Sequence, residues 1–514
     1  MTDLAANNKR IAQNTLFLYL RMLFLMAVSL YTSRVVLNTL GVEDFGIYNV
    51  VGGVVAMFSF INGAMSTGTQ RFLTFEIGRK DINRLKNVFS TSIVIHGLIS
   101  LLVIILAETI GLYFFYEKLV IPADRINAAL WVYQLSILSA IIMIMSVPYN
   151  AIIVAHEKMN AFAYISVLEI VLKLAIVYLL MIGRIDKLKL YAILIFLVQL
   201  TIRLVYSSYC NRHFKEAKFH KSLFNNKLFH EMIVFSIWNL WGGCAAIAFT
   251  QGLNILLNMF FGPTINAARG ISVQVQNTIA QFSQNFQMAL NPQITKSYAT
   301  GDLTYMHSLI YRSSKFTFFL LLLLSSPVML ETETLLCLWL KNVPEYTVIF
   351  LRLMICVTII DAVANPLMVS AAATGKVKVY QGVVGGILLC ILPISYIALK
   401  LGGNPASVFI VHLCVCIIAF IVRLLIIRPM IKLVLSDYVK KVILNCLTTG
   451  TIALIIPLFI KYSLTQTPVW LTFFIVCCTS TLSVILCTFF GGLTVSERQF
   501  VLNKLSTLKY KLKK

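Results

Sequence analysis

Two arginines lie in an otherwise apolar stretch near the beginning of the sequence, "LYLRMLFLMAVSLYTSRVVL", residues 18–37. If the stretch is helical, Arg21 and Arg34 stand about 20 Å apart along it. Neither has an acidic residue three or four positions away, so no neighbour on the same helix neutralises its charge. Guanidinium groups bind phosphates through paired hydrogen bonds. The two arginines predict a cavity that receives an anion, and ion pairing to another helix is the competing explanation.

Five more basic residues fall inside apolar segments. A charge near the bilayer centre costs about 2.5–3.5 kcal/mol on insertion scales, so such a residue usually faces protein or a water-filled cavity. Arg71 and Arg423 lie near predicted helix ends and could equally extend to the membrane surface. We predict that the set as a whole contributes cavity cations. Its members are Arg21, Arg34, Arg71, Lys173, Arg203, Arg352 and Arg423.

Two acidic residues in apolar segments are candidates for gating or ion coupling. Glu169 precedes Lys173 by four positions, which allows an ion pair on one helix face. Asp361 precedes Asn365 by four positions and stands just before Pro366, a combination that predicts an unwound, polar turn. Asp361 there could bind a proton or a cation, or it could pair with a neighbouring arginine.

Amide side chains recur in the segment "SVQVQNTIAQFSQNFQMALNPQITKS", residues 272–297. Gln274, Asn277, Gln281 and Gln284 are spaced by three or four positions and share one helix face. Amides donate and accept hydrogen bonds without carrying charge, which suits the hydroxyl groups of a sugar. Hydrogen bonding between helices is an equally good interpretation of this stripe.

The elements that position these residues are membrane helices. The chain has 514 residues, of which 59% are hydrophobic and only 12% charged, far more apolar than a soluble domain. No HExxH, Walker A or Ser-His-Asp pattern is present, and the seven histidines are scattered, so we expect neither an enzyme, a metal site nor a cofactor. The eleven cysteines lie mostly in apolar segments and are read as small apolar residues.

The net charge of +23 does not indicate a nucleic-acid partner, because basic residues concentrate in alternate loops. Their distribution places both termini in the cytoplasm. Basic clusters such as Lys440-Lys441 and the final "KYKLKK" are explained by topology and by anionic membrane lipids.

We predict an all-α polytopic membrane protein with about fourteen helices. Their expected ranges are 9–40, 44–76, 86–116, 124–153, 159–182, 188–211, 230–260, 264–298, 303–329, 345–373, 377–399, 404–430, 441–461 and 467–491. The expected domains are an N-terminal six-helix lobe at 1–213, a cytoplasmic linker at 214–229, a C-terminal six-helix lobe at 230–430, two additional helices at 431–492 and a basic tail at 493–514.

An internal repeat supports the two lobes. Gly41 and Asp81 recur as Gly262 and Asp302, and "PYNAIIVAHEK" at 148–158 recurs as "PLMVSAAATGK" at 366–376. Six helices per repeat give both halves the same orientation in the membrane. Such bundles commonly bind cargo between their halves and alternate access by rocking. A cavity lined partly by the first, second, seventh and eighth helices is therefore expected.

These patterns of helix, turn and small residue resemble the polysaccharide-unit flippases, the O-antigen transporters of the Wzx type. That family belongs to the multidrug/oligosaccharidyl-lipid/polysaccharide exporter (MOP) superfamily. The resemblance covers nearly the whole chain and is carried by the region from "NTLFLYLRMLF" to "FEIGR", by "PYNAIIVAHEKMNAFAYISVLEIVLKL" and by "PLMVSAAATGKVKVYQ". It implies a cation-lined lumen, which Arg21, Arg34, Arg203 and Lys173 would match.

The resemblance also implies an inner-membrane protein that moves an undecaprenyl-pyrophosphate-linked oligosaccharide from the cytoplasmic to the periplasmic leaflet. Its implied partners are this lipid-linked oligosaccharide, membrane lipids and the polysaccharide polymerase machinery. Coupling to the membrane potential, to protons or to sodium is expected.

Two other functions compete with this expectation. Drug exporters of the same superfamily commonly carry a carboxylate in the first helix, whereas the first helix here carries two arginines and no acid. Membrane glycan polymerases and ligases usually have a large outer loop, but the outer connections here are short. An anionic cargo is therefore favoured over a cationic drug, and a transporter over an enzyme.

Overall fold

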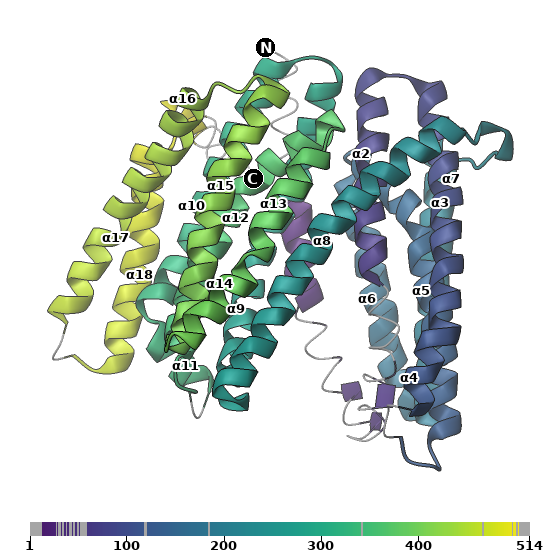
Figure 1. Ribbon diagram of the computed structural model, residues 1–514, viewed down its shortest axis with the longest axis horizontal. Helices are drawn as coiled ribbons and strands as arrows, with labels where there is room; N and C mark the ends of the chain where they lie inside the picture. Colours follow the sequence, from purple (N-terminus) through teal and green to yellow (C-terminus); the bar gives the residue numbers. More distant parts are fainter. Residues whose placement is uncertain are drawn as a thin grey trace, which may run out of the picture. The chain divides into compact units, whose positions relative to one another are not determined.

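The computed structural model describes residues 13–26, 59–117, 121–182, 186–340, 343–464, 467–495 and 497–499, with residue 502 and ten single positions from 28 to 51. The regular elements in these ranges are all helices (Figure 1). Ten helical segments are long and apolar enough to cross a membrane. The prediction of an all-α polytopic membrane protein is confirmed, while the count of fourteen spans stays a prediction.

The described chain divides into two compact units. The first contains the residues up to Gly243 together with Ala289–Asp302 and Gly375–Lys378. Its helix α5 is packed against the neighbouring helices α2, α3, α6 and α7. Besides the helical residues 13–26 it contains α2 (Ser59–Arg79), α3 (Ile82–Leu106), α4 (Leu112–Glu117), α5 (Ile126–Ala155), α6 (Met159–Ile182), α7 (Lys187–His213) and the first half of α8 (Asn226–Phe261).

The second unit contains Cys244–Met288, Leu303–Thr374 and the described residues from Val379 onward. Its helix α12 is packed against α10, α11 and α15, much as α5 is packed in the first unit. The helices of this second unit are most of α9 (Pro263–Ala299), then α10 (Leu303–Leu330), α11 (Thr332–Trp339), α12 (Thr347–Thr374), α13 (Lys378–Leu389), α14 (Ile391–Lys400), α15 (Pro405–Ile431), α16 (Leu435–Tyr438), α17 (Asn445–Ser463) and α18 (Val469–Cys487). The lobe boundaries expected from the sequence stay predictions.

Turns at equivalent positions of the two halves share an uncommon backbone conformation. Lys80, between α2 and α3, has φ 59°, and Gly301, between α9 and α10, has φ 77°. Glu157, after α5, has φ 58°, and Gly375, after α12, has φ 77°. A left-handed residue ends a helix and lets the chain reverse direction. The matching turns support the internal repeat inferred from the sequence.

The predicted helix at 86–116 contains a wider turn that the sequence pattern does not reveal. Residues Ala107–Gly111 form a π-helical turn between α3 and α4. The hydroxyl group of Tyr133, on α5, donates a hydrogen bond to the Ala107 carbonyl oxygen at 2.6 Å. Gly111 leaves room for this hydroxyl, because a Cβ there would collide with it. A side chain from another helix thus accounts for the irregularity.

The prediction of an unwound turn around Asp361 and Pro366 is wrong, because α12 continues without a break through Pro366. Proline has no N–H group, so the Ala362 carbonyl oxygen lacks its usual helical donor. The side-chain amide of Gln287, on α9, donates to that oxygen at 2.8 Å. The Val363 carbonyl oxygen accepts a hydrogen bond from Ser314, on α10, at 2.9 Å. The neighbouring helix α9 therefore satisfies the carbonyl group that proline frees, Ser314 adds a second contact beside it, and the helix persists.

Candidate functional site

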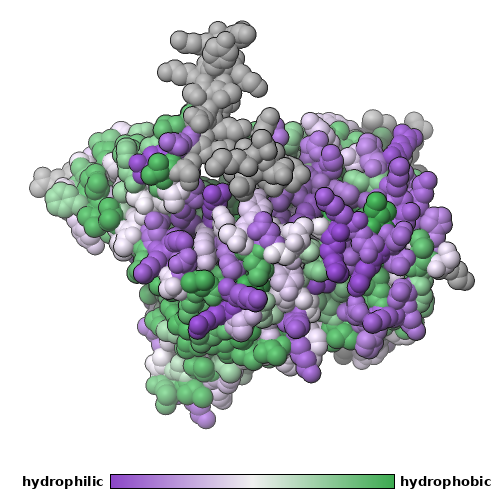
Figure 2. Space-filling model, turned by 90° about the horizontal axis from the view of Figure 1, so that it is seen from above, coloured by the Kyte–Doolittle hydropathy of each residue, from purple (hydrophilic) through white to green (hydrophobic). Residues whose placement is uncertain are grey.

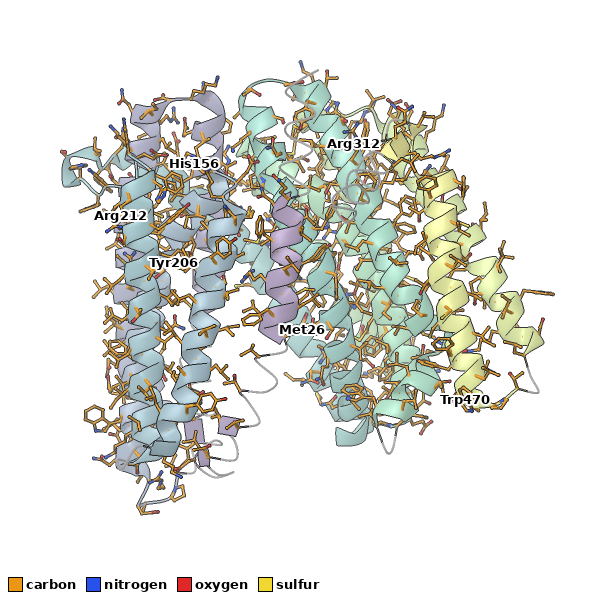
Figure 3. The ribbon with its side chains drawn as sticks, turned by 180° about the vertical axis from the view of Figure 1, so that it is seen from behind. Met26, His156, Tyr206, Arg212, Arg312 and Trp470 are labelled. Atoms are coloured by element: carbon orange, nitrogen blue, oxygen red, sulfur yellow. The ribbon has the colours of Figure 1, made fainter. Side chains whose placement is uncertain are left out.

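The first unit contains a group of polar residues around Arg21. Residues 13–26 form a helix without a carboxylate, and the Arg21 guanidinium carbon lies 4.6 Å from the ring centre of Phe162 on α6. Its Nε atom is buried without a hydrogen-bond partner among the described residues. Tyr206, on α7 (Figure 3), and Glu169, on α6, are close enough to act on its charge. Arg21 is thus held by an aromatic face and has unused donor capacity.

Glu169 and Lys173 form the ion pair that their spacing predicts. Lys173 Nζ lies 2.7 Å from Glu169 Oε1, and both side chains are only partly exposed. Gln199, on α7, also donates to Glu169 Oε1, at 3.4 Å. The carboxylate is therefore shared between Lys173 and an amide, and it also faces the charge of Arg21.

Arg203, on α7, has an aromatic partner of the same kind. Its guanidinium carbon lies 4.1 Å from the ring centre of Tyr149 on α5. One terminal nitrogen of the guanidinium is buried without a hydrogen-bond partner among the described residues. Cation–π contacts of this kind contribute about 0.5–2 kcal/mol. They leave the N–H groups of the arginine available.

The two arginines each have the chemistry that an anion requires. Within the first unit, Arg21, Lys173 and Arg203 are three cations with Glu169 as the carboxylate near two of them. Buried guanidinium nitrogens without acceptors suit phosphate oxygens, which accept several charge-assisted hydrogen bonds. In the described part of the chain no group of three or more metal-ligand residues lies together.

Two other candidate cations give different results. Arg34 lies outside the described residues. The guanidinium carbon of Arg71 lies 4.6 Å from the ring centre of Phe72 and 5.6 Å from that of Phe235, and the guanidinium packs beside Gly375. Arg71 is thus enclosed by aromatic side chains and by a turn without a side chain.

In the second unit, Arg423 pairs with Asp361. Arg423, on α15, approaches the Asp361 carboxylate at 3.4 Å, and the Arg423 side chain is only 6% exposed. It is therefore packed inside the protein. The Asp361 side chain is half exposed, and the Oδ1 atom of Asn365, one turn along α12, is buried without a hydrogen-bond partner among the described residues. Of the two explanations for Asp361, the geometry shows pairing with an arginine.

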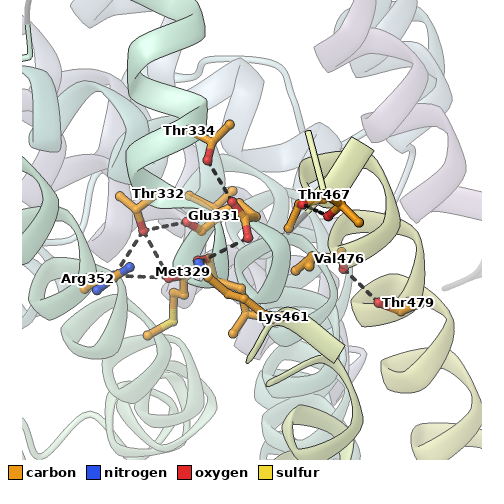
Figure 4. A network of polar contacts seen from close by, with 12 residues as sticks. Met329, Glu331, Thr332, Thr334, Arg352, Lys461, Thr467, Val476 and Thr479 are labelled. Carbon is orange, nitrogen blue, oxygen red and sulfur yellow. Dashed lines mark hydrogen bonds and ion pairs between the residues drawn. The ribbon is translucent and has the colours of Figure 1, made fainter. Parts of the chain in front are cut away.

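Arg352 caps the end of a helix. Its Nε atom donates to the Met329 carbonyl oxygen at 3.1 Å and to the Thr332 hydroxyl at 3.2 Å (Figure 4). Lys461, on α17, pairs with Glu331 at 3.1 Å in the same network. Carbonyl groups at the end of α10 lack helical donors, and positive side chains stabilise them. Arg352 is thus engaged at a junction between α10 and α11.

The four amides of the predicted stripe, Gln274, Asn277, Gln281 and Gln284, are all exposed along one face of α9. Two amides outside the stripe instead bind α12: Gln276 donates to Thr358 at 2.8 Å, and Gln287 donates to Ala362. The helix α9 therefore carries two kinds of amide: buried or half-buried ones that bind α12, and exposed ones that could bind a ligand.

Sequence reasoning missed the aromatic residues that hold the arginines, namely Phe162 and Tyr149. Phe162 and Tyr149 lie on helices distant in sequence from their arginines. Their role required the packed structure.

Comparison with known proteins defines the class of fold. Residues 18–179 match the MatE family. No curated protein sequence matches the chain. The structure is similar to a MATE protein in its bent conformation, with a TM-score of 0.72 and 14% identity over 83% of this chain and 96% of that chain.

Two further solved structures show the same likeness. One is an outward-facing multidrug resistance MATE family transporter of the MOP superfamily, with a TM-score of 0.70 and 14% identity over 83% of this chain and 96% of that one. The other is a MOP superfamily transporter from Pyrococcus furiosus, with a TM-score of 0.66 and 15% identity over 84% and 96%. The chain therefore has the fold of MATE transporters, and its residues 18–179 match the MatE family model.

Proposed function

We propose that this protein is an exporter of the cytoplasmic membrane whose cargo is an undecaprenyl-pyrophosphate-linked oligosaccharide. The observation that carries the proposal is the environment of Arg21: a helix without a carboxylate presents a guanidinium that is stacked on Phe162 and has an unpartnered buried nitrogen. Arg203 has the same two features. Such groups favour a pyrophosphate over a cationic drug.

The exposed amides of α9 support a glycan as the second part of the cargo. Gln274, Asn277, Gln281 and Gln284 are on one face, and none of their side chains has a hydrogen-bond partner among the described residues. Amides can exchange hydrogen bonds with sugar hydroxyls without repelling the pyrophosphate. The isoprenoid chain would remain in lipid during transfer.

The membrane potential can give this transport its direction. An inside-negative potential favours outward movement of an anion by about 2.3 kcal/mol per charge per 100 mV. The cationic site, once empty, is drawn back inward. The scheme needs no bound cofactor, and the polymerase that elongates the glycan is the expected partner on the outer side.

Export of a small cationic molecule is the second candidate function. It is favoured by the fold, which a multidrug resistance transporter shares. Under this function Glu169 or Asp361 would bind the coupling ion. The fold itself does not fix the cargo, since the Pyrococcus furiosus transporter is described as having a binding pocket of reversed polarity that suggests a different function.

The test is the leaflet distribution of lipid-linked oligosaccharide in cells lacking this protein, measured with an impermeant glycan label. We expect the unit to accumulate on the cytoplasmic face and to be cleared by the wild type. Arg21→Ala and Arg203→Ala should fail to clear it, and Arg21→Lys should retain little export because an ammonium cannot form paired hydrogen bonds. Arg212→Ala is the matched control, because Arg212 is exposed at the end of α7 (Figure 3).

The two candidate functions predict opposite results in one experiment. Normal surface glycan in cells lacking the protein, with increased sensitivity to cationic dyes, would establish small-molecule export instead. Full export by Arg21→Lys and Arg203→Lys would show that these arginines do not bind the pyrophosphate through paired hydrogen bonds. The proposed transport itself would still stand.

A further inference from the structure

We propose that a basic cavity in the second unit binds the phosphodiester headgroup of an anionic phospholipid. The cavity has a volume of about 670 Å³ and lies between α10, the segment from α16 to α17, and the residues that follow α18. Its basic and aromatic lining residues are His307, Tyr311, Arg312, Lys315, Lys440 and Lys441. The proposal does not depend on the cargo proposed above.

The cavity has an excess of positive charge. Four lining residues are Lys or Arg, whereas two, Asp437 and Glu497, are acidic, which leaves a formal charge of +2 with His307 neutral. Lys441 pairs with Asp437 at 2.7 Å. Lys440 is exposed and forms no ion pair with an acidic residue in the described part of the chain. A ligand with a negative charge would balance this excess.

The inner wall is fixed by a buried ion pair. Lys315 Nζ lies 2.6 Å from Glu497 Oε2, and both side chains are less than a tenth exposed. Arg312 approaches the other Glu497 oxygen at 3.7 Å through Nε, while its side chain is about one third exposed. The terminal nitrogens of Arg312 are not engaged by this contact. They can bind phosphate oxygens from a position that Glu497 holds in place.

Aromatic contacts make the remaining wall rigid. His307 Nε2 donates to the Ile431 carbonyl oxygen at 2.9 Å, which fixes the orientation of the imidazole. Tyr311 stacks near His307, and Lys441 Nζ lies 5.7 Å from the Tyr311 ring centre. Asn445 also lines the cavity, and its Oδ1 atom is buried without a hydrogen-bond partner among the described residues. That oxygen is suited to accept a hydrogen bond from a glycerol hydroxyl.

The surroundings favour a lipid over a soluble phosphate. Leu444 and Leu447 belong to the helical segments that border the cavity, and they are 49% and 56% exposed. They offer an apolar surface for acyl chains. α16 lies at the upper end of its unit in Figure 1, and Arg312 is labelled at the same end in Figure 3. Figure 2 shows this end from above, and many hydrophilic side chains lie on the face that it presents.

That end is the one that the basic residues predict to be cytoplasmic. Basic pockets between membrane helices on this side bind anionic headgroups. The walls come from α10 of the repeated bundle and from α16, α17 and the residues after α18, which have no counterpart in the repeat. A bound headgroup would therefore join the additional helices to the bundle.

The test measures binding of phosphatidylglycerol to the detergent-purified full-length chain by native mass spectrometry, with phosphatidylcholine as the neutral comparison. We expect phosphatidylglycerol to be preferred, and Lys440→Gln combined with Lys441→Gln to weaken its binding about ten-fold. The matched control is Lys215→Gln combined with Lys218→Gln, which removes the same charge from exposed positions outside the cavity. The control should bind as the wild type does.

Three outcomes would overturn the proposal. The first is equal binding of phosphatidylglycerol and phosphatidylcholine. The second is an equal loss of phosphatidylglycerol binding in the cavity variant and in the control. The third is displacement of phosphatidylglycerol by inorganic phosphate at comparable concentration. The last outcome would identify a soluble phosphate as the ligand. An unchanged unfolding temperature without lipid shows that the cavity variant is folded. Because the readout is binding alone, failure of the proposed transport function would not affect the result.

Discussion

The side-chain amide of Gln287 donates a hydrogen bond to the carbonyl oxygen of Ala362, 2.8 Å away. This contact explains how α12 remains helical at Pro366, which has no N–H to offer that oxygen. Gln287 is buried, whereas the stripe amides on the same helix are exposed. One helix thus carries both a structural amide and a set of amides available for cargo.

Replacing Gln287 by leucine should lower the free energy of unfolding by about 1–3 kcal/mol, because a buried carbonyl group loses its donor. In a Pro366→Ala background the cost should shrink, since alanine restores the helical N–H. Unfolding in mixed micelles of increasing denaturing detergent measures both values. Gln284→Leu, at an exposed position of α9, is the control and should change stability by less than about 0.5 kcal/mol. Equal costs in both backgrounds would contradict the explanation.

Glu157 and Lys296 form a buried ion pair in the first unit. The Glu157 side chain is fully buried, and its second carboxylate oxygen accepts a hydrogen bond from Gln293. Glu157→Gln or Lys296→Met alone should lower the free energy of unfolding by up to about 3–5 kcal/mol, because each removes one half of a largely buried ion pair. The double variant should recover much of this loss. A double variant whose loss equals the sum of the single ones would show that the two side chains are not coupled.

Asp361→Asn distinguishes structural pairing from ion coupling. Because Arg423 is buried, loss of the carboxylate charge should lower the free energy of unfolding by about 1–3 kcal/mol. The response of transport to a pH gradient should stay as in the wild type, measured in vesicles with the membrane potential clamped. Glu169→Gln is the matched comparison at a carboxylate within another apolar helix, α6. Loss of the pH response with normal stability in Asp361→Asn would make Asp361 the coupling group.

Acid should weaken the structure around the linker that follows α7. Burial alone would raise the pKa of Glu216, but the hydrogen bond with His156, 2.6 Å away, and further hydrogen bonds bring the pKa below its ordinary value of 4.5. A lowered folded pKa stabilises the protein above the unfolded pKa, and this contribution is lost as the pH falls through the folded value.

Stability should therefore decline as the pH drops below about 4.5 in the wild type, and this decline should be smaller in Glu216→Gln. Thermal unfolding measured from pH 6 to about pH 3 checks the expectation. Lys218→Gln, an exposed position in the same linker, serves as control. An identical acid decline in wild type and Glu216→Gln would assign the effect to other carboxylates.

Several elements follow from the sequence because their causes are local. The range predicted for α6, 159–182, matches the observed Met159–Ile182, since an apolar run between polar turns defines a membrane helix. The Glu169–Lys173 pair follows from a spacing of four residues on one helix. The exposed amide face of α9 follows from its periodicity in the same way.

The errors and omissions arise where a distant side chain decides. Asp361, Asn365 and Pro366 suggested an unwound turn, but Gln287 supplies the missing donor from a segment 75 positions away. Tyr133 produces the wide turn at Ala107 from 26 positions away. Neither partner can be chosen from local spacing, because each helix has several faces and many possible neighbours.

The sequence by itself determined that the chain enters a membrane, that its spans are helical, and which charges fall within them. Those conclusions depend on hydropathy and on the cost of an unsatisfied backbone in lipid, and both are properties of single segments. Only the tertiary structure decided which of these charges pair, as Asp361 does with Arg423 across 62 positions. It also decided which keep a buried nitrogen without a hydrogen-bond partner among the described residues, as Arg21 does beside Phe162. A charge finds its partner only when two helix faces pack together.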